Sequence, residues 1–131
     1  MKLFYIANAR IPTEKAHGLQ IMKMCEAFAR SGLEVELIIP NRKNPIKKDT
    51  FDFYDIERKF KIKKIFSLNP PSIKGLGIIT LHSQNISFAL NVFFNVLFNS
   101  KKYSSDSIFY FRDRFSPWLL ALLNRKIFIE F

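Results

Sequence analysis

The sequence predicts an α/β fold, a Rossmann-like, doubly wound and mostly parallel sheet of about five strands. Short apolar runs alternate with helical patterns along the chain, as in sheets whose helices cover both faces. The opening unit shows this most clearly. An apolar strand over residues 3–7 leads into a polar loop over 8–17, an amphipathic helix and a second strand over 34–39. Parallel sheets bind ligands at the carboxyl ends of their strands, so we expect the functional site at this long, charged loop.

The first helix is expected to start near Gly18 and to end at Gly32. A left-handed glycine commonly caps a helix and lets the chain turn back into a strand. Cys25 lies on the apolar face of this helix, which predicts a packed core thiol rather than a nucleophile. Apolar residues recur at spacings of three and four, as a helix covering a sheet requires: Ile21, Met22, Met24, Cys25, Phe28 and Ala29.

The segments after the second strand predict a loop, a short helix and an edge strand. The basic and turn-rich segment 41–48 is expected to be a solvated surface loop. Residues 51–57 fit a short helix with aromatic anchors. Lysines and apolar residues alternate over 60–66, which predicts a strand with one wet face. Lysines discourage pairing with further strands, so this strand is expected near a sheet edge.

The segment 75–100 contains no Asp, Glu, Lys or Arg and is long enough to cross a bilayer. We expect instead a long helix packed on the sheet, because polar side chains would lie in the hydrocarbon if it spanned. Its narrow polar face is expected to point toward solvent or toward a neighbouring domain. A membrane-surface helix is the alternative. The polar residues recur every three to four positions, at Gln84, Ser87, Asn91, Asn95 and Asn99.

The last third of the chain repeats the strand–helix–strand order. A strand is expected over 107–111 and a helix over 115–124, with Ser116 as N-cap and Pro117 in the first turn. A final strand covers 127–131. Because the sequence ends within that strand, we expect residues 1–131 to be one domain that is incomplete at its C-terminal end.

The chain is strongly basic, with 21 Lys and Arg against 11 Asp and Glu and a formal net charge of +10. Such a field attracts nucleic acid, anionic lipid or phosphate-bearing substrates without choosing among them. One cysteine excludes an internal disulfide and a cysteine-based zinc site. The apolar run after Met1 is too short for a signal peptide, so a cytoplasmic location is expected.

The loop before the first helix carries the best candidate site residues. A helix N-terminus offers unpaired N–H groups and a positive dipole end, which suit a phosphate. Gly18 would let a diphosphate approach the backbone, and Arg10, Lys15 and His17 would add charge. The alternative is a turn glycine among solvated charges, and the residues alone leave both open. Neither a dinucleotide-binding nor a P-loop fingerprint is present.

Two further candidates follow later strands. Arg112 could clamp a carboxylate or phosphate at two points, or form a salt bridge within its own loop. Glu130 is an acid near the end of an apolar strand, a position that can bind or catalyse. The basic runs 42–48 and 58–64 fit a nucleic-acid surface or an anionic lipid surface equally well. The aromatics mixed with them are Phe51, Phe53, Tyr54, Phe60 and Phe66.

These segments, in this order, resemble a known family. The strand and loop LFYIANARIPTEKAHG (3–18), the helix QIMKMCEAFA (20–29) and the cap at Gly32 are similar to the N-terminal domain of family 4 glycosyltransferases. Those enzymes have the GT-B architecture, two Rossmann-like domains that face each other across a cleft. The segments FYFRD (109–113) and IFIE (127–130) resemble two later strands of that domain. The resemblance is sharpest in the N-terminal third of the chain.

The resemblance implies a retaining transferase that moves a sugar from a nucleotide-sugar to an acceptor, with no metal or other cofactor. The N-terminal domain would mainly hold the acceptor, while Gly18, with His17 beside it, would approach the donor diphosphate. Arg112 and Glu130 would line the cleft. The family's next histidine and its donor-binding C-terminal domain would lie beyond Phe131, so the 131-residue chain is expected to be inactive by itself.

The implied setting is bacterial cell-envelope polysaccharide or lipopolysaccharide synthesis. The expected partners are a nucleotide-sugar, a glycan or lipid-linked acceptor, and the missing C-terminal domain. The basic charge would dock the protein on the anionic inner face of the plasma membrane, and nucleic acid is not the expected partner. The competing hypothesis is a stand-alone Rossmann-like module that binds anions or nucleic acid without catalysis.

Overall fold

The computed structural model describes residues 1–68, 75, 77–99, 101–103, 106–112, 116–123 and 126–129. Each strand and helix predicted from the sequence corresponds to one element, with ends that differ by a few residues. The elements alternate in the order β1 (Lys2–Ile6), α1 (Ala16–Arg30), β2 (Glu34–Asn41), α2 (Thr50–Tyr54), β3 (Lys61–Phe66), α3 (Gly77–Phe98), β4 (Ile108–Phe111), α4 (Ser116–Ala121) and β5 (Lys126–Ile129).

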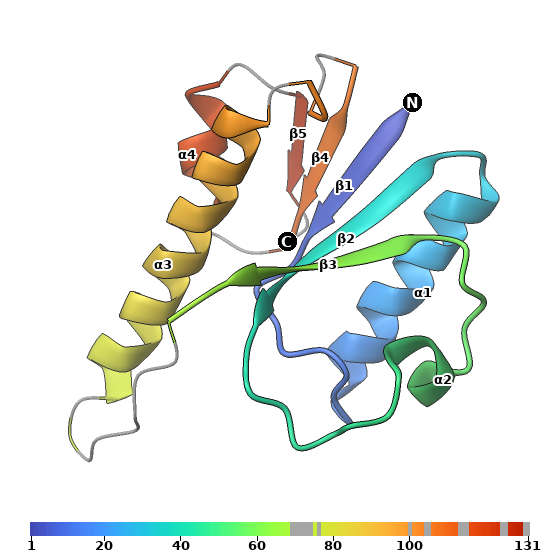
Figure 1. Cartoon of the computed structure of the whole chain (residues 1–131), viewed down its shortest axis with the longest axis horizontal. Helices are drawn as coiled ribbons and strands as arrows, with labels where there is room; N and C mark the ends of the chain where they lie inside the picture. The colour runs from blue at the N-terminus through green and yellow to red at the C-terminus, as the bar shows by residue number, and fades with distance from the viewer. Residues whose placement is uncertain are drawn as a thin grey trace.

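The described strands form one five-stranded sheet in the order β3-β2-β1-β4-β5. Every neighbouring pair is parallel; Phe4 of β1, for example, lies between Glu36 of β2 and Phe109 of β4. The chain runs outward from β1 to β3 and then crosses back through α3 to β4 (Figure 1). The strand order therefore reverses between β1 and β4, and such a switch point leaves a crevice at the carboxyl ends of the strands. The predicted Rossmann-like fold class is confirmed.

Helices cover both faces of the sheet, α1 and α2 on one side and α3 and α4 on the other (Figure 1). Successive strand residues point to opposite faces, so β1 contributes to two cores. Leu3 and Tyr5 belong to the core beneath α1, whereas Phe4 and Ile6 belong to the core beneath α3. Because both faces are covered, the central strands are apolar at consecutive positions instead of alternating.

The first helix confirms two predictions made from its sequence. α1 begins at Ala16, slightly before the expected start, so His17 and Gly18 lie in its first turn. Cys25 is fully buried, and burial raises the pKa of its thiol, as expected of a core cysteine. Gly32 has a φ of 99°, a left-handed conformation that favours glycine at the end of a helix.

The centre of the polar stripe on α3 faces the domain. Ser87 is buried, and its Oγ accepts a hydrogen bond from the Leu68 N–H at 3.1 Å. Asn95 Oδ1 accepts from Lys63 Nζ at 3.0 Å and from the Tyr103 hydroxyl at 2.7 Å. The prediction that this stripe faces solvent or another domain is therefore wrong for these residues. The polar groups of Lys63, Leu68 and Tyr103 need hydrogen-bond acceptors where they are shielded from water, and the polar stripe of α3 supplies these acceptors.

The remaining predictions concern an edge strand, a helix cap and the end of the chain. β3 is an edge strand, as its lysines predicted. Ser116 is the first residue of α4, rather than a cap that precedes the helix. Glu130 and Phe131 lie outside the described residues. In the part of the chain that the structure describes, no helix is both long and apolar enough to cross a membrane.

Candidate functional site

The neighbouring strands β1, β2 and β4 all end on the same side of the sheet, at its carboxyl-terminal end. The Arg112 N–H donates to the Ile6 carbonyl at 3.0 Å, so the exit from β4 lies beside the loop that follows β1. The parallel strand β2 ends at Asn41 on the same edge. Residues that follow β1, β2 and β4 therefore come together at the switch point, where Rossmann-like folds bind their ligands.

A hollow of about 480 Å³ opens at this edge. It brings together three of the predicted residues, Arg10, Lys15 and His17. Among the described residues that line it, five have basic side chains and none has an acidic one. We call it the basic hollow, and its single sign of charge favours an anionic ligand. Its lining consists of Asn8, Ala9, Arg10, Thr13, Lys15, His17, Arg42, Lys43 and Gln84.

Arg42 is a member of the basic hollow that the sequence did not single out. Its Nη2 donates to Asn8 Oδ1 at 2.6 Å, and Asn8 Nδ2 donates in turn to Asn85 Oδ1 at 2.6 Å. Arg42 Nε is buried and has no hydrogen-bond partner among the described residues. Burial lowers the pKa of this guanidinium. A bound anion would compensate for the hydration that the charge has lost.

The segment 41–48, expected to be a solvated loop, is only partly solvated. Lys47 and Lys48 are exposed, but Arg42 is half-buried and Asn44 Nδ2 donates to the Pro12 carbonyl at 2.8 Å. The reason is topological: this segment leaves β2 on the same edge as the loop after β1, so the two loops meet. Arg42 directly follows the parallel strand β2, and this position in the sequence could have identified it as a site residue.

Arg112 lies beside the lining of the basic hollow. Its Nη2 donates to Gln20 Oε1 on α1 at 2.7 Å. Its Nη1 is buried without a hydrogen-bond partner in the described part of the chain. The alternative prediction, a salt bridge within its own loop, concerns residues 113–114, which lie outside the described residues. The predicted role of Arg112 in lining a cleft stays a prediction, while its position at the switch point is observed.

His17 titrates in a basic environment. Burial, followed by the positive charges of Arg112 and Lys15, lowers the pKa of His17 below its usual 6.5. All three effects disfavour the charged imidazolium. The neutral imidazole is therefore the major form at pH 7, and it can donate one hydrogen bond and accept another. A bound anion would offset the two electrostatic effects and raise this pKa.

Gly18 allows α1 to pack closely against neighbouring side chains. A Cβ at this position would overlap the Tyr54 hydroxyl and would approach Thr13 Cγ2 to 2.6 Å. The Gly18 N–H donates to the Lys15 carbonyl at 3.1 Å, so it already has a partner at the start of the helix. The structure thus gives this glycine a packing role. Its contact with a diphosphate stays a prediction.

Tyr54 holds the loop that carries the site residues. Its hydroxyl accepts from the Thr13 N–H and donates to the Thr13 carbonyl, both at 2.8 Å. The Lys15 N–H donates to Thr13 Oγ1 at 3.3 Å, just before α1 begins. The loop between β1 and α1 is therefore fixed by a side chain from α2, which the sequence did not reveal.

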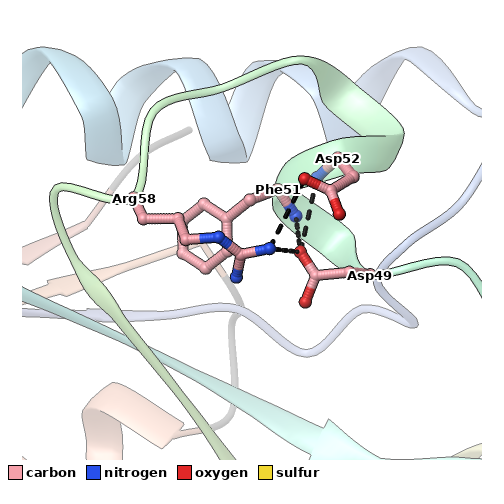
Figure 2. A network of polar contacts seen from close by, with 4 residues as sticks. All are labelled: Asp49, Phe51, Asp52 and Arg58. Carbon is pink, nitrogen blue, oxygen red and sulfur yellow. Dashed lines mark hydrogen bonds and ion pairs between the residues drawn. The ribbon is translucent and has the colours of Figure 1, made fainter.

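A polar network braces α2 itself (Figure 2). Asp49 caps the helix, with Oδ1 accepting from the Phe51 N–H at 3.1 Å and the Asp52 N–H at 3.4 Å. Arg58 Nη2 donates to the same Oδ1 at 2.7 Å, and its guanidinium lies 5.1 Å from the centre of the Phe51 ring. This network sets the position of α2 and thereby of Tyr54.

Acids contribute little to the described site. The position of Glu130 in a cleft stays a prediction, because this residue lies outside the described ranges. Within those ranges, no group of three or more His, Cys, Asp or Glu side chains could hold a metal ion. The chemistry available at the described edge is binding of an anion by guanidinium, ammonium and imidazole groups.

The aromatics of the basic runs do not form a platform for nucleic-acid bases. Phe51 and Phe60 are buried in the core and contact each other, with ring centres 5.0 Å apart. The hydroxyl of Tyr54 is bonded to the loop, as described above. Phe66 is exposed, but single-strand binding relies on successive aromatic faces. Of the five aromatics mixed with the basic runs, Phe51 and Phe60 therefore belong to the core and Tyr54 packs against it.

Comparisons with known proteins find a likeness in fold. No protein-family model and no curated protein matches the sequence. A crystal structure of a UGT transferase from Siraitia grosvenorii in complex with UDP matches with a TM-score of 0.62 and 13% identity, over 99% of this chain and 27% of that chain. The structure of apo UGT2 from Phytolacca americana matches with a TM-score of 0.61 and 14% identity, over 100% of this chain and 29% of that one.

The fold is thus glycosyltransferase-like, a Rossmann-like module of the GT-B type. The chain spans less than a third of the length of either transferase that it matches. At this level of identity the likeness concerns the fold alone. The assignment to family 4, which the sequence resemblance implies, stays a prediction.

Proposed function

We propose that this chain is the acceptor-side domain of a nucleotide-sugar-dependent glycosyltransferase. The observation that carries the proposal is the basic hollow, which lies at the switch point of a fold shared with UDP-glycosyltransferases. One of those structures is in complex with UDP. The diphosphate of a nucleotide-sugar is an anion that suits a site whose described lining has basic side chains and no acidic one.

The residues have distinct roles in this proposal. Arg42 and Arg10 donate hydrogen bonds to phosphate oxygens, because a guanidinium can contact two oxygens at once. Lys15 adds a point charge at the start of α1, where the helix dipole also favours an anion. His17, mainly neutral at pH 7, donates a hydrogen bond to the sugar or phosphate. Gly18 keeps the start of the helix close to the ligand.

The reaction proposed is sugar transfer with retention at the anomeric carbon. The bond between that carbon and the diphosphate oxygen breaks, and the departing diphosphate keeps the electron pair. The oxygen of the acceptor hydroxyl forms the new bond to the carbon, and its proton passes to the departing diphosphate oxygen. Basic side chains and the helix dipole stabilise the charge of the diphosphate, and we propose that no metal is required. A donor-binding domain would supply the remaining groups, so the 131-residue chain would bind without turnover.

The acceptor proposed is a glycan or lipid-linked glycan of bacterial cell-envelope polysaccharide or lipopolysaccharide synthesis. Such acceptors are made at the inner face of the plasma membrane, so we place the intact protein there as a peripheral protein. The basic net charge of +10 supports this location, since anionic lipid attracts basic proteins.

The decisive experiment is a titration of the isotopically labelled chain with UDP, followed by NMR. We expect millimolar affinity, with chemical-shift changes at the residues of the basic hollow. Arg42→Gln should weaken binding by about tenfold, the value expected for a lost hydrogen bond to a charged group. Lys126→Gln is the matched control, because Lys126 begins β5 at the opposite edge of the sheet. No shift with UDP, or equal weakening by both variants, would refute the proposed diphosphate site in the basic hollow.

A further inference from the structure

The outer side of α3 is apolar and exposed. α4 packs against α3 and carries the exposed Trp118, at 80% exposure, and Leu122, just after the end of α4, is 76% exposed. Monomeric proteins rarely leave so many large apolar side chains together in water. We call these residues, with those of α3, the outer apolar surface. The residues of α3 recur at spacings that place them on one helical face: Ile79, Ile86, Leu90, Phe94 and Leu97.

Hydrogen bonds made by Ser87 and Asn95 fix this face outward. Ser87 accepts from Leu68, and Asn95 accepts from Lys63 and Tyr103. Rotating the helix to bury its apolar face would break these bonds and leave the buried Tyr103 hydroxyl without its acceptor. Buried donors without acceptors are costly. Whatever covers the outer apolar surface must therefore come from beyond the described residues.

Charge selects the kind of partner. Segment 75–100 carries no Asp, Glu, Lys or Arg, and Lys101 follows it, exposed at the end of α3. The chain as a whole carries +10. A second copy would bring the same positive charge, and the two would repel each other. A bilayer with anionic headgroups offers hydrocarbon to the apolar side chains and negative charge to the basic protein.

We propose that the outer apolar surface docks on an anionic lipid bilayer, with α3 lying in the plane of the interface. The 22 residues of α3 make a helix about 33 Å long. Phe94, Leu90 and Ile86 enter the boundary of the acyl chains, while Trp118 lies at the level of the headgroups, where its indole N–H can stay hydrated. The inference deepens the membrane location proposed above by naming the surface, and it does not depend on sugar transfer.

The chain contains one tryptophan, so its fluorescence reports on this surface alone. The protein is mixed with vesicles of phosphatidylcholine, or of phosphatidylcholine with phosphatidylglycerol, in the absence of nucleotide. We expect flotation with the anionic vesicles, a blue shift of Trp118 emission, and quenching by lipids brominated on their acyl chains. Equal binding to neutral vesicles, or flotation without a change in Trp118 emission, would overturn the proposal.

Matched variants separate docking at this surface from general stickiness. Leu90→Ser removes an apolar side chain that is 40% exposed on α3, and Leu19→Ser removes one that is 45% exposed on α1, across the sheet. We expect the first variant to lower vesicle partitioning by about tenfold and the second to leave it unchanged. Circular dichroism and UDP titration of both variants show whether the fold and the nucleotide site remain intact. Equal loss in both variants would overturn the proposal. So would a dimer, detected by sedimentation without lipid, that Leu90→Ser dissociates.

Discussion

The guanidinium of Arg42 donates to the side-chain oxygen of Asn8 at 2.6 Å and so joins the carboxyl ends of β2 and β1. The same Asn8 donates from Nδ2 to Asn85 on α3. One amide therefore connects two strands to the helix that crosses the opposite face of the sheet. It also orients Arg42, a half-buried cation of the basic hollow, so the site depends on a neutral residue as well as on charged ones.

Asn8→Asp should weaken UDP binding while preserving an acceptor for Arg42. A carboxylate there forms an ion pair with the guanidinium and repels a diphosphate, and we expect at least a tenfold loss, about 1.4 kcal/mol. Asn99→Asp makes the same change of charge at an exposed position near the end of α3. Calorimetric titration with UDP compares the two. If both variants bind equally, Asn8 does not position the site.

Gly18→Ala should destabilise the fold by about 1–3 kcal/mol, the usual cost of overpacking, because the new Cβ would overlap the Tyr54 hydroxyl. In the Tyr54→Phe background, which lacks that oxygen, Gly18→Ala should cost less stability than it does in the wild-type chain. Gly77→Ala is the control, because nothing lies within 4 Å of a Cβ there. Urea unfolding measures all of these variants. A Gly18→Ala variant as stable as Gly77→Ala would contradict the packing role.

Each described helix and strand was predicted from the sequence. The patterns are clear because the strands are apolar and the helices that pack on the two faces of the sheet each carry an apolar stripe. The lysines of β3 correctly marked an edge strand. The stripe on α3 was misassigned for a physical reason. A helical pattern shows which residues share a face, but not which face meets the sheet. Here the inner side had to satisfy Lys63, Leu68 and Tyr103, and these donors are scattered in the sequence.

Candidate residues were predicted where the chain follows β1 and β4, but Arg42, which follows β2, was not predicted as a site residue. Arg10, Lys15 and His17 were identified because they lie between a strand and a helix N-terminus. Arg42 was missed because it begins a basic run that resembles a solvated loop, and only the pairing of β1 with β2 brings it to Asn8. The dependence of Gly18 on Tyr54 joins residues far apart in sequence, so no local pattern could show it.

The pKa of His17 should respond to its neighbours and to ligand. It lies below 6.5 because burial, Arg112 and Lys15 disfavour the imidazolium. Arg112→Gln removes one positive charge and should raise this pKa toward 6.5, and saturating UDP should raise it in the wild-type chain. An NMR titration of the imidazole resonances measures both effects. Lys126→Gln, at the far edge of the sheet, should leave the pKa unchanged. If Arg112→Gln leaves the pKa of His17 unchanged, Arg112 does not influence this imidazole and the described arrangement of the two side chains is wrong.

Substitutions of Asn95 and Tyr103 should be coupled in their effects on the free energy of unfolding. No such coupling would be expected if the polar stripe of α3 faced solvent. Asn95→Ala leaves the buried Tyr103 hydroxyl without its acceptor, which costs about 1–3 kcal/mol. In the Tyr103→Phe background that penalty disappears, so the same substitution should cost less by about 1 kcal/mol. Asn99→Ala, which loses only a bond to the Asn95 carbonyl within α3, should show no coupling to Tyr103→Phe. Chemical unfolding of the single and double variants gives the coupling energy. A value near zero would mean that the polar stripe does not hold α3 on the sheet, and the outward orientation of its apolar face would lose its explanation.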